Sequence, residues 1–196
     1  MLRKTMFALL IAAACMLVAS QVYAFPMSGV SNFAVTTPGT AWTSTVTWEL
    51  YAPGDTNSHL AADSNWHYFY YITNTTTSGS TSLKTFTIGN PATATIVSVG
   101  SIDRGAGTPA PSLALDQGDS IAYYFFGNPI APGQATDWLY YTSPVAPQWV
   151  QGGLVNGGIT DHQALPGPAP EPASVAMLGL GLIGMAVRTI KKKFNA

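Results

Sequence analysis

Residues 42–50 constrain the fold more than any other stretch, because two kinds of side chain alternate along them. Bulky apolar residues and one serine hold the even positions, and three threonines and a glutamate hold the odd ones. A period of two places each set on its own face of an extended strand. The sequence therefore predicts a β-strand with one buried face.

A second strand is predicted over residues 66–73, where Tyr68, Tyr70 and Ile72 share one face and Phe69 and Tyr71 the other. Aromatic residues on both faces predict a central strand that is covered on both sides. Further short runs rich in β-forming residues occupy residues 83–88, 93–101, 120–126 and 138–142, and 154–155 form a candidate last edge strand.

Glycine and proline clusters separate these runs, and no part of the middle of the chain sustains a 3.6-residue periodicity. Short strands with such spacing are typical of an antiparallel sandwich. The predicted fold class is therefore all-β, an antiparallel β-sandwich that is Ig-like or jelly-roll-like, with a small barrel as the alternative.

The start of the chain has the features of a secretory signal peptide. Arg3 and Lys4 supply the positive segment, residues 7–19 the apolar segment, and a small residue, Ala24, the predicted cleavage position. The alternative is an uncleaved N-terminal anchor. Cys15, the single cysteine, lies inside the apolar segment, so cleavage at Ala24 leaves a mature protein without a thiol or a disulfide.

The predicted domain, residues 25–163, is acidic although the whole chain carries a formal charge of only −1. Most basic residues lie in the two terminal segments, and only Lys84 and Arg104 remain in the middle of the chain. Contacts to phosphate groups need lysine and arginine, so this composition excludes nucleic-acid binding as a function class.

The end of the chain is built differently from the middle. Residues 164–172 form a predicted proline-rich linker that contains Pro-Glu-Pro, and residues 173–187 are an uncharged apolar run. With residues up to 190 this run predicts a membrane helix of marginal length, whose alternative is a buried core helix. Residues 191–196 are a predicted cytoplasmic basic tail, and the anchoring cations are Arg188, Lys191, Lys192 and Lys193.

This order of motif, apolar span and basic end resembles the PEP-CTERM sorting signal of Gram-negative bacteria. The resemblance covers only the segment from Pro170 to Ala196. It implies that Pro170, Glu171 and Pro172 are recognised by an exosortase, a membrane transpeptidase that removes the tail. It also implies export, anchoring in the inner membrane before processing, and a final place at the cell surface or outside the cell, often together with exopolysaccharide.

No catalytic constellation stands out in the predicted domain, and neither an enzymatic activity nor a cofactor is expected. Its histidines are His59, His67 and His162, and the neighbouring Asp161 does not orient His162 as a triad requires. Residues 116–119, Asp-Gln-Gly-Asp, offer oxygen ligands to calcium, but the same pattern is typical of an ordinary β-turn, which we favour. No metal site is predicted.

The aromatic residues are the remaining candidates for binding. Tryptophan and tyrosine stack on the apolar faces of sugars, yet a sandwich without disulfides also needs them to fill its core. Core packing is the favoured role of the set, and Tyr140, Tyr141 and Trp149 are the candidates for ligand stacking. The sequence thus predicts an exported, non-enzymatic surface or matrix protein. An exopolysaccharide-binding module is the alternative, followed by an envelope hydrolase.

Overall fold

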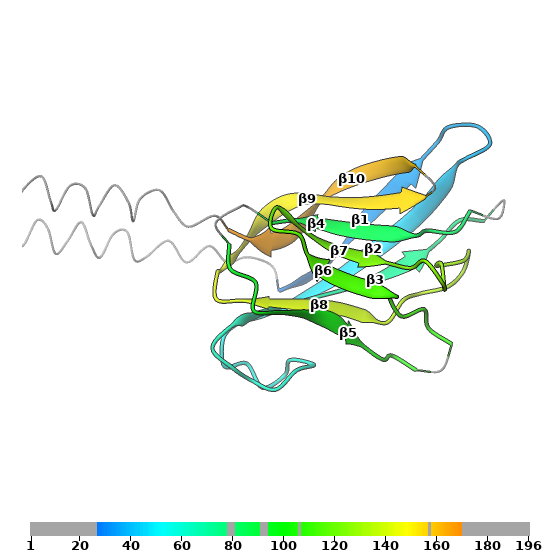
Figure 1. The fold of residues 1–196 in the computed structure, drawn as a ribbon. Helices are drawn as coiled ribbons and strands as arrows, with labels where there is room; N and C mark the ends of the chain where they lie inside the picture. Colours follow the sequence, from blue (N-terminus) through cyan, green and yellow to red (C-terminus); the bar gives the residue numbers. More distant parts are fainter. Residues whose placement is uncertain (1–26, 78–80, 91–93, 106, 157, 170–196) are drawn as a thin grey trace, which may run out of the picture.

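The computed structural model describes residues 27–77, 81–90, 94–105, 107–156 and 158–169, and in this part of the chain it contains strands and no helix. The strands form two antiparallel five-stranded sheets that pack against each other (Figure 1). The first sheet has the order β1-β2-β3-β8-β5. Its strands are β1 (Ser28–Val35), β2 (Trp42–Tyr51), β3 (Trp66–Asn74), β8 (Trp138–Ser143) and β5 (Ser98–Ile102).

The second sheet has the order β10-β9-β4-β7-β6. Its strands are β10 (Ile159–Pro168), β9 (Pro147–Asn156), β4 (Thr85–Gly89), β7 (Ser120–Tyr124) and β6 (Leu113–Asp116). The predicted all-β class and the antiparallel sandwich are therefore confirmed.

The alternation along β2 has the predicted effect. Its even-numbered residues, from Trp42 to Leu50, are all buried, while the odd-numbered ones are exposed or half-buried. The prediction that residues 66–73 form a central strand is also confirmed, because β3 pairs with β2 on one side and β8 on the other. Phe69, on the outer face of β3, is completely buried.

The outer face of β3 is covered by the segment between β2 and β3, residues 52–65. His59 of this segment lies with its ring centre 4.8 Å from that of Phe69 and 4.8 Å from that of Trp138. Its Nε2 lies 3.0 Å from a Glu49 carboxylate oxygen, which also accepts the Tyr51 hydroxyl at 2.6 Å. A loop thus supplies the second layer that the aromatic residues on this face require.

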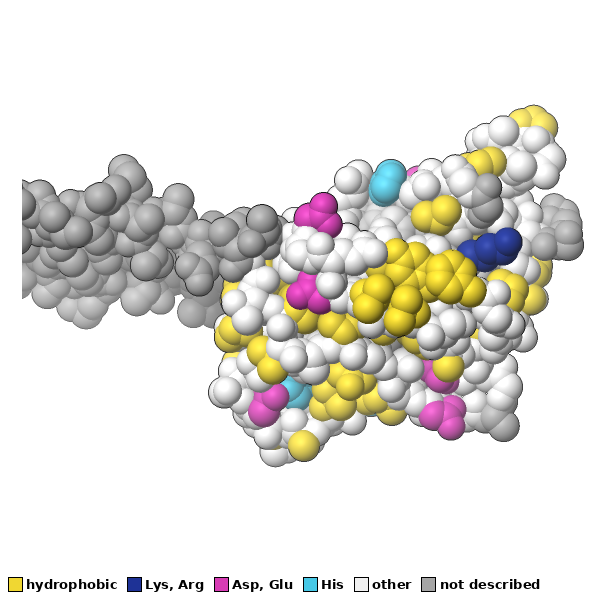
Figure 2. Space-filling model, in the orientation of Figure 1, with side chains coloured by type: hydrophobic (Ala, Val, Ile, Leu, Met, Phe, Trp, Pro, Cys, Tyr) yellow, Lys and Arg dark blue, Asp and Glu magenta, His cyan; other side chains and the backbone are white. Residues whose placement is uncertain are grey.

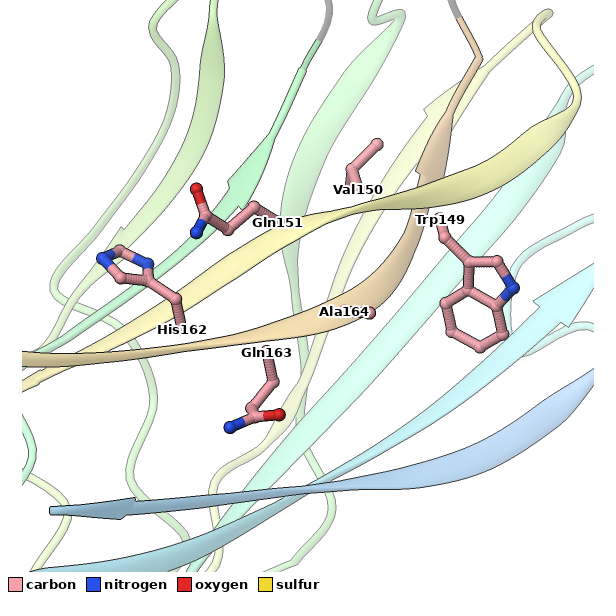
Figure 3. Close-up of a pocket in the computed structure, with 6 residues that line it drawn as sticks. All are labelled: Trp149, Val150, Gln151, His162, Gln163 and Ala164. Carbon is pink, nitrogen blue, oxygen red and sulfur yellow. The ribbon is translucent and has the colours of Figure 1, made fainter.

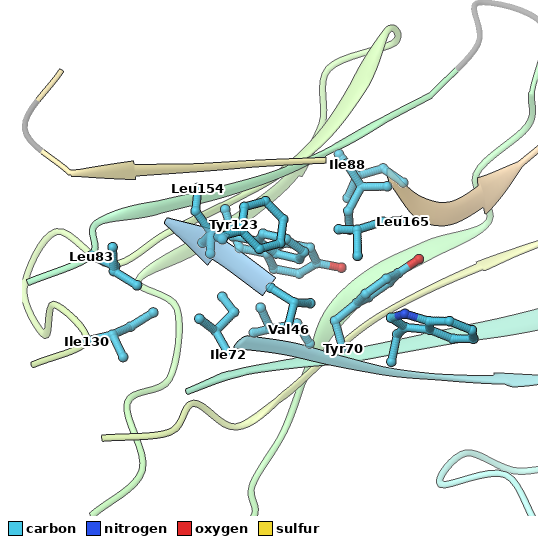
Figure 4. Packing of buried hydrophobic residues seen from close by; sticks show 14 of the residues in the cluster. Val46, Tyr70, Ile72, Leu83, Ile88, Tyr123, Ile130, Leu154 and Leu165 are labelled. Carbon is cyan, nitrogen blue, oxygen red and sulfur yellow. The ribbon is translucent and has the colours of Figure 1, made fainter. Parts of the chain in front are cut away.

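The core between the two sheets contains tyrosines whose hydroxyls reach the backbone of the other sheet (Figure 4). The Tyr70 hydroxyl donates to the carbonyl of Pro166 in β10 at 2.5 Å, and the Tyr123 hydroxyl donates to the carbonyl of Tyr140 in β8 at 2.7 Å. A buried phenol needs such a partner, because an unpaired hydroxyl in an apolar core is costly. These bonds join the sheets in a domain whose described residues contain no cysteine.

At one side of the sandwich the edge strands β1 and β10 meet. The Ser31 hydroxyl donates to the carbonyl of Ala164 at 3.0 Å, and the backbone N–H of Ala34 donates to a carboxylate oxygen of Asp161 at 2.9 Å. These bonds between β1 and β10 satisfy backbone groups at the open edges of the two sheets, which protects both edges from pairing with another chain.

Four strands lie outside the main runs that the sequence predicts. They are β1, β6, β9 and β10, of which only residues 154–155 in β9 are expected as a strand. Strand β10 also occupies residues 164–168 of the predicted linker, and its residues from Leu165 to Pro168 are buried. The folded sheet therefore extends almost to the Pro-Glu-Pro motif.

The terminal predictions concern residues that the structure does not describe. The signal peptide with its cleavage at Ala24, the motif residues Pro170, Glu171 and Pro172, the helix over residues 173–190 and the basic tail all lie outside the described ranges. Within those ranges, no helix has the length and apolar character needed to cross a membrane.

Candidate functional site

A hollow of about 310 Å³ lies along the β9–β10 hairpin (Figure 3). Figure 3 shows the side chains of Trp149 and Gln163 directed toward β1 and β2, and those of Gln151 and His162 on the other side of β10. An indole offers an apolar face, while the two amides and the imidazole offer hydrogen-bond donors and acceptors. The residues that line the hollow are Trp149, Val150, Gln151, His162, Gln163 and Ala164.

Trp149 is the aromatic residue of this hollow, and 51% of it is exposed. Its ring meets that of the buried Trp48 edge to face, with ring centres 5.6 Å apart and planes at 83°. Trp48 packs under β1 because its cross-strand partner is Gly29, where a Cβ atom would lie 2.4 Å from the indole. The buried Trp48 therefore orients the exposed ring of Trp149.

Asp161 and His162, the adjacent acidic and basic residues of β10, serve opposite faces of the strand. Asp161 accepts the backbone N–H of Ala34 and, at 3.2 Å, the amide of Gln163, so its carboxylate serves the seam between the sheets. His162 is the next residue in an extended strand and points to the opposite face, over Gly153. The pair therefore lacks the mutual orientation of a catalytic dyad, as the sequence predicts.

The other predicted stacking residues lie elsewhere. Tyr140 is half-buried on the outer face of β8, with its ring centre 6.0 Å from that of Phe69. Tyr141 is completely buried and stacks on Tyr68 at 4.5 Å. Its proposal as a ligand-stacking residue was therefore wrong, since in β8 the residue after an outward-facing tyrosine must face the core.

A hydrogen-bonded network of polar side chains joins the 52–65 segment to β3. The Ser58 hydroxyl lies 2.6 Å from Nδ1 of His67, and Nε2 of His67 lies 3.0 Å from a carboxylate oxygen of Asp63. This is the order of groups in a Ser-His-Asp triad, but with the two ring nitrogens exchanged, since in the triad the serine bonds Nε2 and the aspartate Nδ1. No sequence pattern predicts this network, because Ser58 and Asp63 reach His67 only when the segment folds back on β3.

The environment of this network favours a structural role. The His67 side chain is only 3% exposed, and the Ser58 oxygen also accepts the backbone N–H of Leu60 at 3.2 Å. Hydrogen bonds from the side chain and backbone of Asn65, with a smaller contribution from His67, hold the pKa of Asp63 below its ordinary value. Both ring nitrogens of His67 thus have partners that close the loop, whereas a nucleophile also needs an open approach and donors for an oxyanion.

The predicted turn over residues 116–119 is present. It joins β6 to β7, with Gly118 at φ +88° and its N–H donating to the Asp116 carboxylate at 2.9 Å. These are the features of an aspartate-capped β-turn. In the ranges that the structure describes, His, Cys, Asp and Glu side chains nowhere gather in threes or more.

Comparison with known proteins concerns the tail alone. The family model described as the PEP-CTERM protein-sorting motif matches residues 168–192. No curated protein and no solved structure matches the chain. The match includes the Pro-Glu-Pro tripeptide, the apolar run and most of the basic cluster, and it begins at the last residue of β10. A motif of this kind implies export, and anchoring in a membrane until an exosortase processes the protein. The tail of this chain is therefore similar to PEP-CTERM protein-sorting motifs.

Proposed function

We propose that this protein is a non-catalytic component of the cell surface or extracellular matrix, delivered there by its sorting tail. The observation that carries the proposal is that the sorting motif begins where the last strand ends, so the tail joins the sandwich with almost no linker. The sandwich is thus the part that processing releases.

The chemistry of the described residues supports a non-catalytic role. The group with the order of a triad that the described residues contain, Ser58, His67 and Asp63, closes a loop. The proposal excludes nucleophilic catalysis by Ser58, and this can be tested without knowing a substrate. An alkyl fluorophosphonate, which forms a bond to activated serine oxygens, should not label the folded protein. Stoichiometric labelling that disappears in Ser58→Ala would contradict the proposal.

Delivery is tested by fractionation of the host cells. Wild-type protein is expected at the cell surface or in the medium, in a form shorter than the full chain. A variant with Glu171→Ala and Pro172→Ala should remain in the inner membrane at full length, because the processing enzyme no longer recognises the tripeptide. Asp119→Ala serves as the matched control, since it also removes one carboxylate but lies in an exposed turn of the sandwich, where it accepts the Ser120 hydroxyl. Equal release of both variants would contradict the role of the tripeptide.

A second candidate function is the binding of a neutral saccharide in the hollow beside Trp149. The observation in its favour is the half-exposed indole held edge to face on Trp48, with amide side chains nearby. Stacking of a sugar on such a ring would contribute without any charged group. The hollow is at the small end of ligand sites, which fits one or two sugar units at a time.

Affinity electrophoresis of the full chain in detergent, through gels containing neutral polysaccharides, tests this candidate. Trp149→Ala should abolish retardation. Phe126→Ala is the matched control, because Phe126 is 67% exposed and lies outside the hollow. Loss of retardation in both variants, or in neither, would exclude the hollow as the binding site.

A further inference from the structure

Arg104, which follows β5, lies on an aromatic surface outside the hollow. The carbon of its guanidinium group is 3.8 Å from the ring centre of Tyr71 and 5.3 Å from that of Trp138. The two rings meet edge to face with their centres 4.8 Å apart. Tyr71 and Trp138 belong to neighbouring strands and point to the outer face of the first sheet. The guanidinium group of Arg104 therefore packs on two rings that the pairing of β3 with β8 holds in place.

The guanidinium group has few other partners. One of its nitrogens donates to the carbonyl of Thr136 at 3.3 Å, and within the described residues no carboxylate forms an ion pair with it. Asp137 is close, but its carboxylate accepts the backbone N–H of Arg104 and the hydroxyl of Thr108. Asp103 accepts the N–H of Gly105 at 2.8 Å. Both acidic neighbours thus bind backbone or hydroxyl groups and leave most of the guanidinium donors to solvent.

The arrangement differs from an ordinary surface arginine in two respects. An arginine stacked on an aromatic ring has already lost much of its rotational freedom, so less is lost when it binds a ligand. It is also one of only two lysine or arginine side chains in the described residues, the other being Lys84, and these types are sparse on the face that Figure 2 shows. A cation that the fold orients without neutralising is suited to a negatively charged partner.

The neighbouring surface of the first sheet is mainly polar, and the carboxylate on this face of β2, Glu49, pairs with His59. In the register of β2 and β3, Thr47 lies opposite Tyr71 and Thr45 lies opposite Thr73, and Asn32 of β1 lies opposite Thr45. These outward-facing residues are exposed or half-buried. Hydroxyl and amide groups beside aromatic rings fit a ligand that carries many hydroxyl groups as well as its charge.

We propose that Arg104, Tyr71 and Trp138 form a binding site for an acidic saccharide, whose carboxylate pairs with the free edge of the Arg104 guanidinium. The planar fork of arginine matches the two oxygens of a carboxylate, and the threonine surface of β2 and β3 takes the hydroxyl groups of the adjoining sugars. This site goes beyond the second candidate function, because it takes acidic rather than neutral saccharides and lies on a different surface.

Calorimetric titration of the full chain in detergent with an oligogalacturonate, and with a neutral oligosaccharide of the same length, tests the site. Arg104→Gln should weaken oligogalacturonate binding about tenfold or more, the effect of losing a charge-assisted hydrogen bond. Lys84→Gln is the matched control, because it makes the same charge change directly before β4 of the other sheet and should change affinity by less than about twofold. Arg104→Lys keeps the charge without the fork and should lie between Arg104→Gln and wild type.

The outcomes separate the two proposals. Equal weakening by Arg104→Gln and Lys84→Gln would show general charge attraction and overturn the site, as would oligogalacturonate binding no tighter than that of the neutral oligosaccharide. Neutral binding that survives in Arg104→Gln and is lost in Trp149→Ala would then leave the second candidate function standing. If the wild-type protein binds neither saccharide, both are wrong. A melting temperature of Arg104→Gln equal to that of wild type excludes misfolding as the cause of its weaker binding.

Discussion

At the scale of single residues, the buried tyrosines explain how a sandwich without disulfides keeps its two sheets together. Tyr70 and Tyr123 each fill core volume and also bond to the backbone of the facing sheet. A phenylalanine would fill nearly the same volume but would remove the hydrogen bond to the facing sheet. The hydroxyl groups are therefore expected to add to the stability that burial of the rings provides.

Tyr70→Phe should destabilise the protein by about 1–3 kcal/mol, because the buried carbonyl of Pro166 loses its donor. Urea unfolding followed by circular dichroism measures this difference. Tyr124→Phe is the control, since that hydroxyl accepts the Gln117 amide in an exposed bond. A loss of stability in Tyr124→Phe as large as that in Tyr70→Phe would contradict the role given to the buried bond.

Asp63 should make stability depend on pH in the acidic range. Its pKa in the folded protein is lowered, so the carboxylate stabilises the fold above the unfolded-state pKa of about 4, and this contribution is lost as the pH falls through the folded-state pKa. Wild type should therefore be more stable than Asp63→Asn at neutral pH, and the difference should shrink on acidification. Melting temperatures measured across this range test it, and a constant difference would be evidence against it.

At the scale of secondary-structure elements, the β9–β10 hairpin is the part most dependent on close packing. Gly152 of β9 lies where a Cβ atom would be 2.3 Å from a methyl group of Leu165 in β10. The leucine fills the core only because its neighbour has no side chain. This hairpin also carries the hollow and ends at the sorting motif.

Gly152→Ala should cost about 1–3 kcal/mol, the usual effect of overpacking a core. Gly127→Ala is a suitable control, because its nearest contact would be the Ser112 hydroxyl at 3.9 Å. Chemical denaturation of both variants measures the difference. A Gly152→Ala protein as stable as wild type would mean that Leu165 can move aside.

The strands also differ in how well the sequence predicts them. Strands β2 and β3 could be predicted because their apolar residues are bulky and regularly spaced. Strand β10 could not, because Pro166, Gly167 and Pro168 resemble a linker and are held in the sheet by contacts with residues distant in sequence, such as Tyr70. Periodicity reports which face of a strand is buried, and it carries no information about partners supplied by another sheet.

The candidate sites were partly predictable for a related reason. Trp149 could be named from its residue type, whereas Tyr141 differs from Tyr140 only in the direction that the pleat of β8 gives it. Arg104 gave no signal in the sequence, because its position on Tyr71 depends on the pairing of β3 with β8. Sites built across strands require the register, which single-sequence patterns do not contain.

At the scale of the whole molecule, burial of the tyrosines predicts sensitivity to alkali. The pKa values of Tyr68, Tyr70, Tyr123 and Tyr141 are raised, chiefly by burial. Because the folded-state pKa lies above the unfolded value of about 10, these groups favour the fold below that pH and the contribution is lost as the pH rises further.

Tyrosinate absorbance and circular dichroism recorded together during an alkaline titration test this prediction. The four buried tyrosines should ionise only as the protein unfolds, so the last part of the absorbance change should coincide with the loss of the strand signal. Complete ionisation while the strand signal persists would contradict the buried, bonded tyrosines of the core.

The central claim is that the sandwich is exported and then separated from its sorting tail. The most direct measurement is the intact mass of the protein isolated from its host, with sequencing of both ends. The account predicts a chain that begins at Phe25 and has lost the apolar and basic segments after the Pro-Glu-Pro motif. Recovery of the complete 20.6 kDa chain from mature envelope or medium would contradict it.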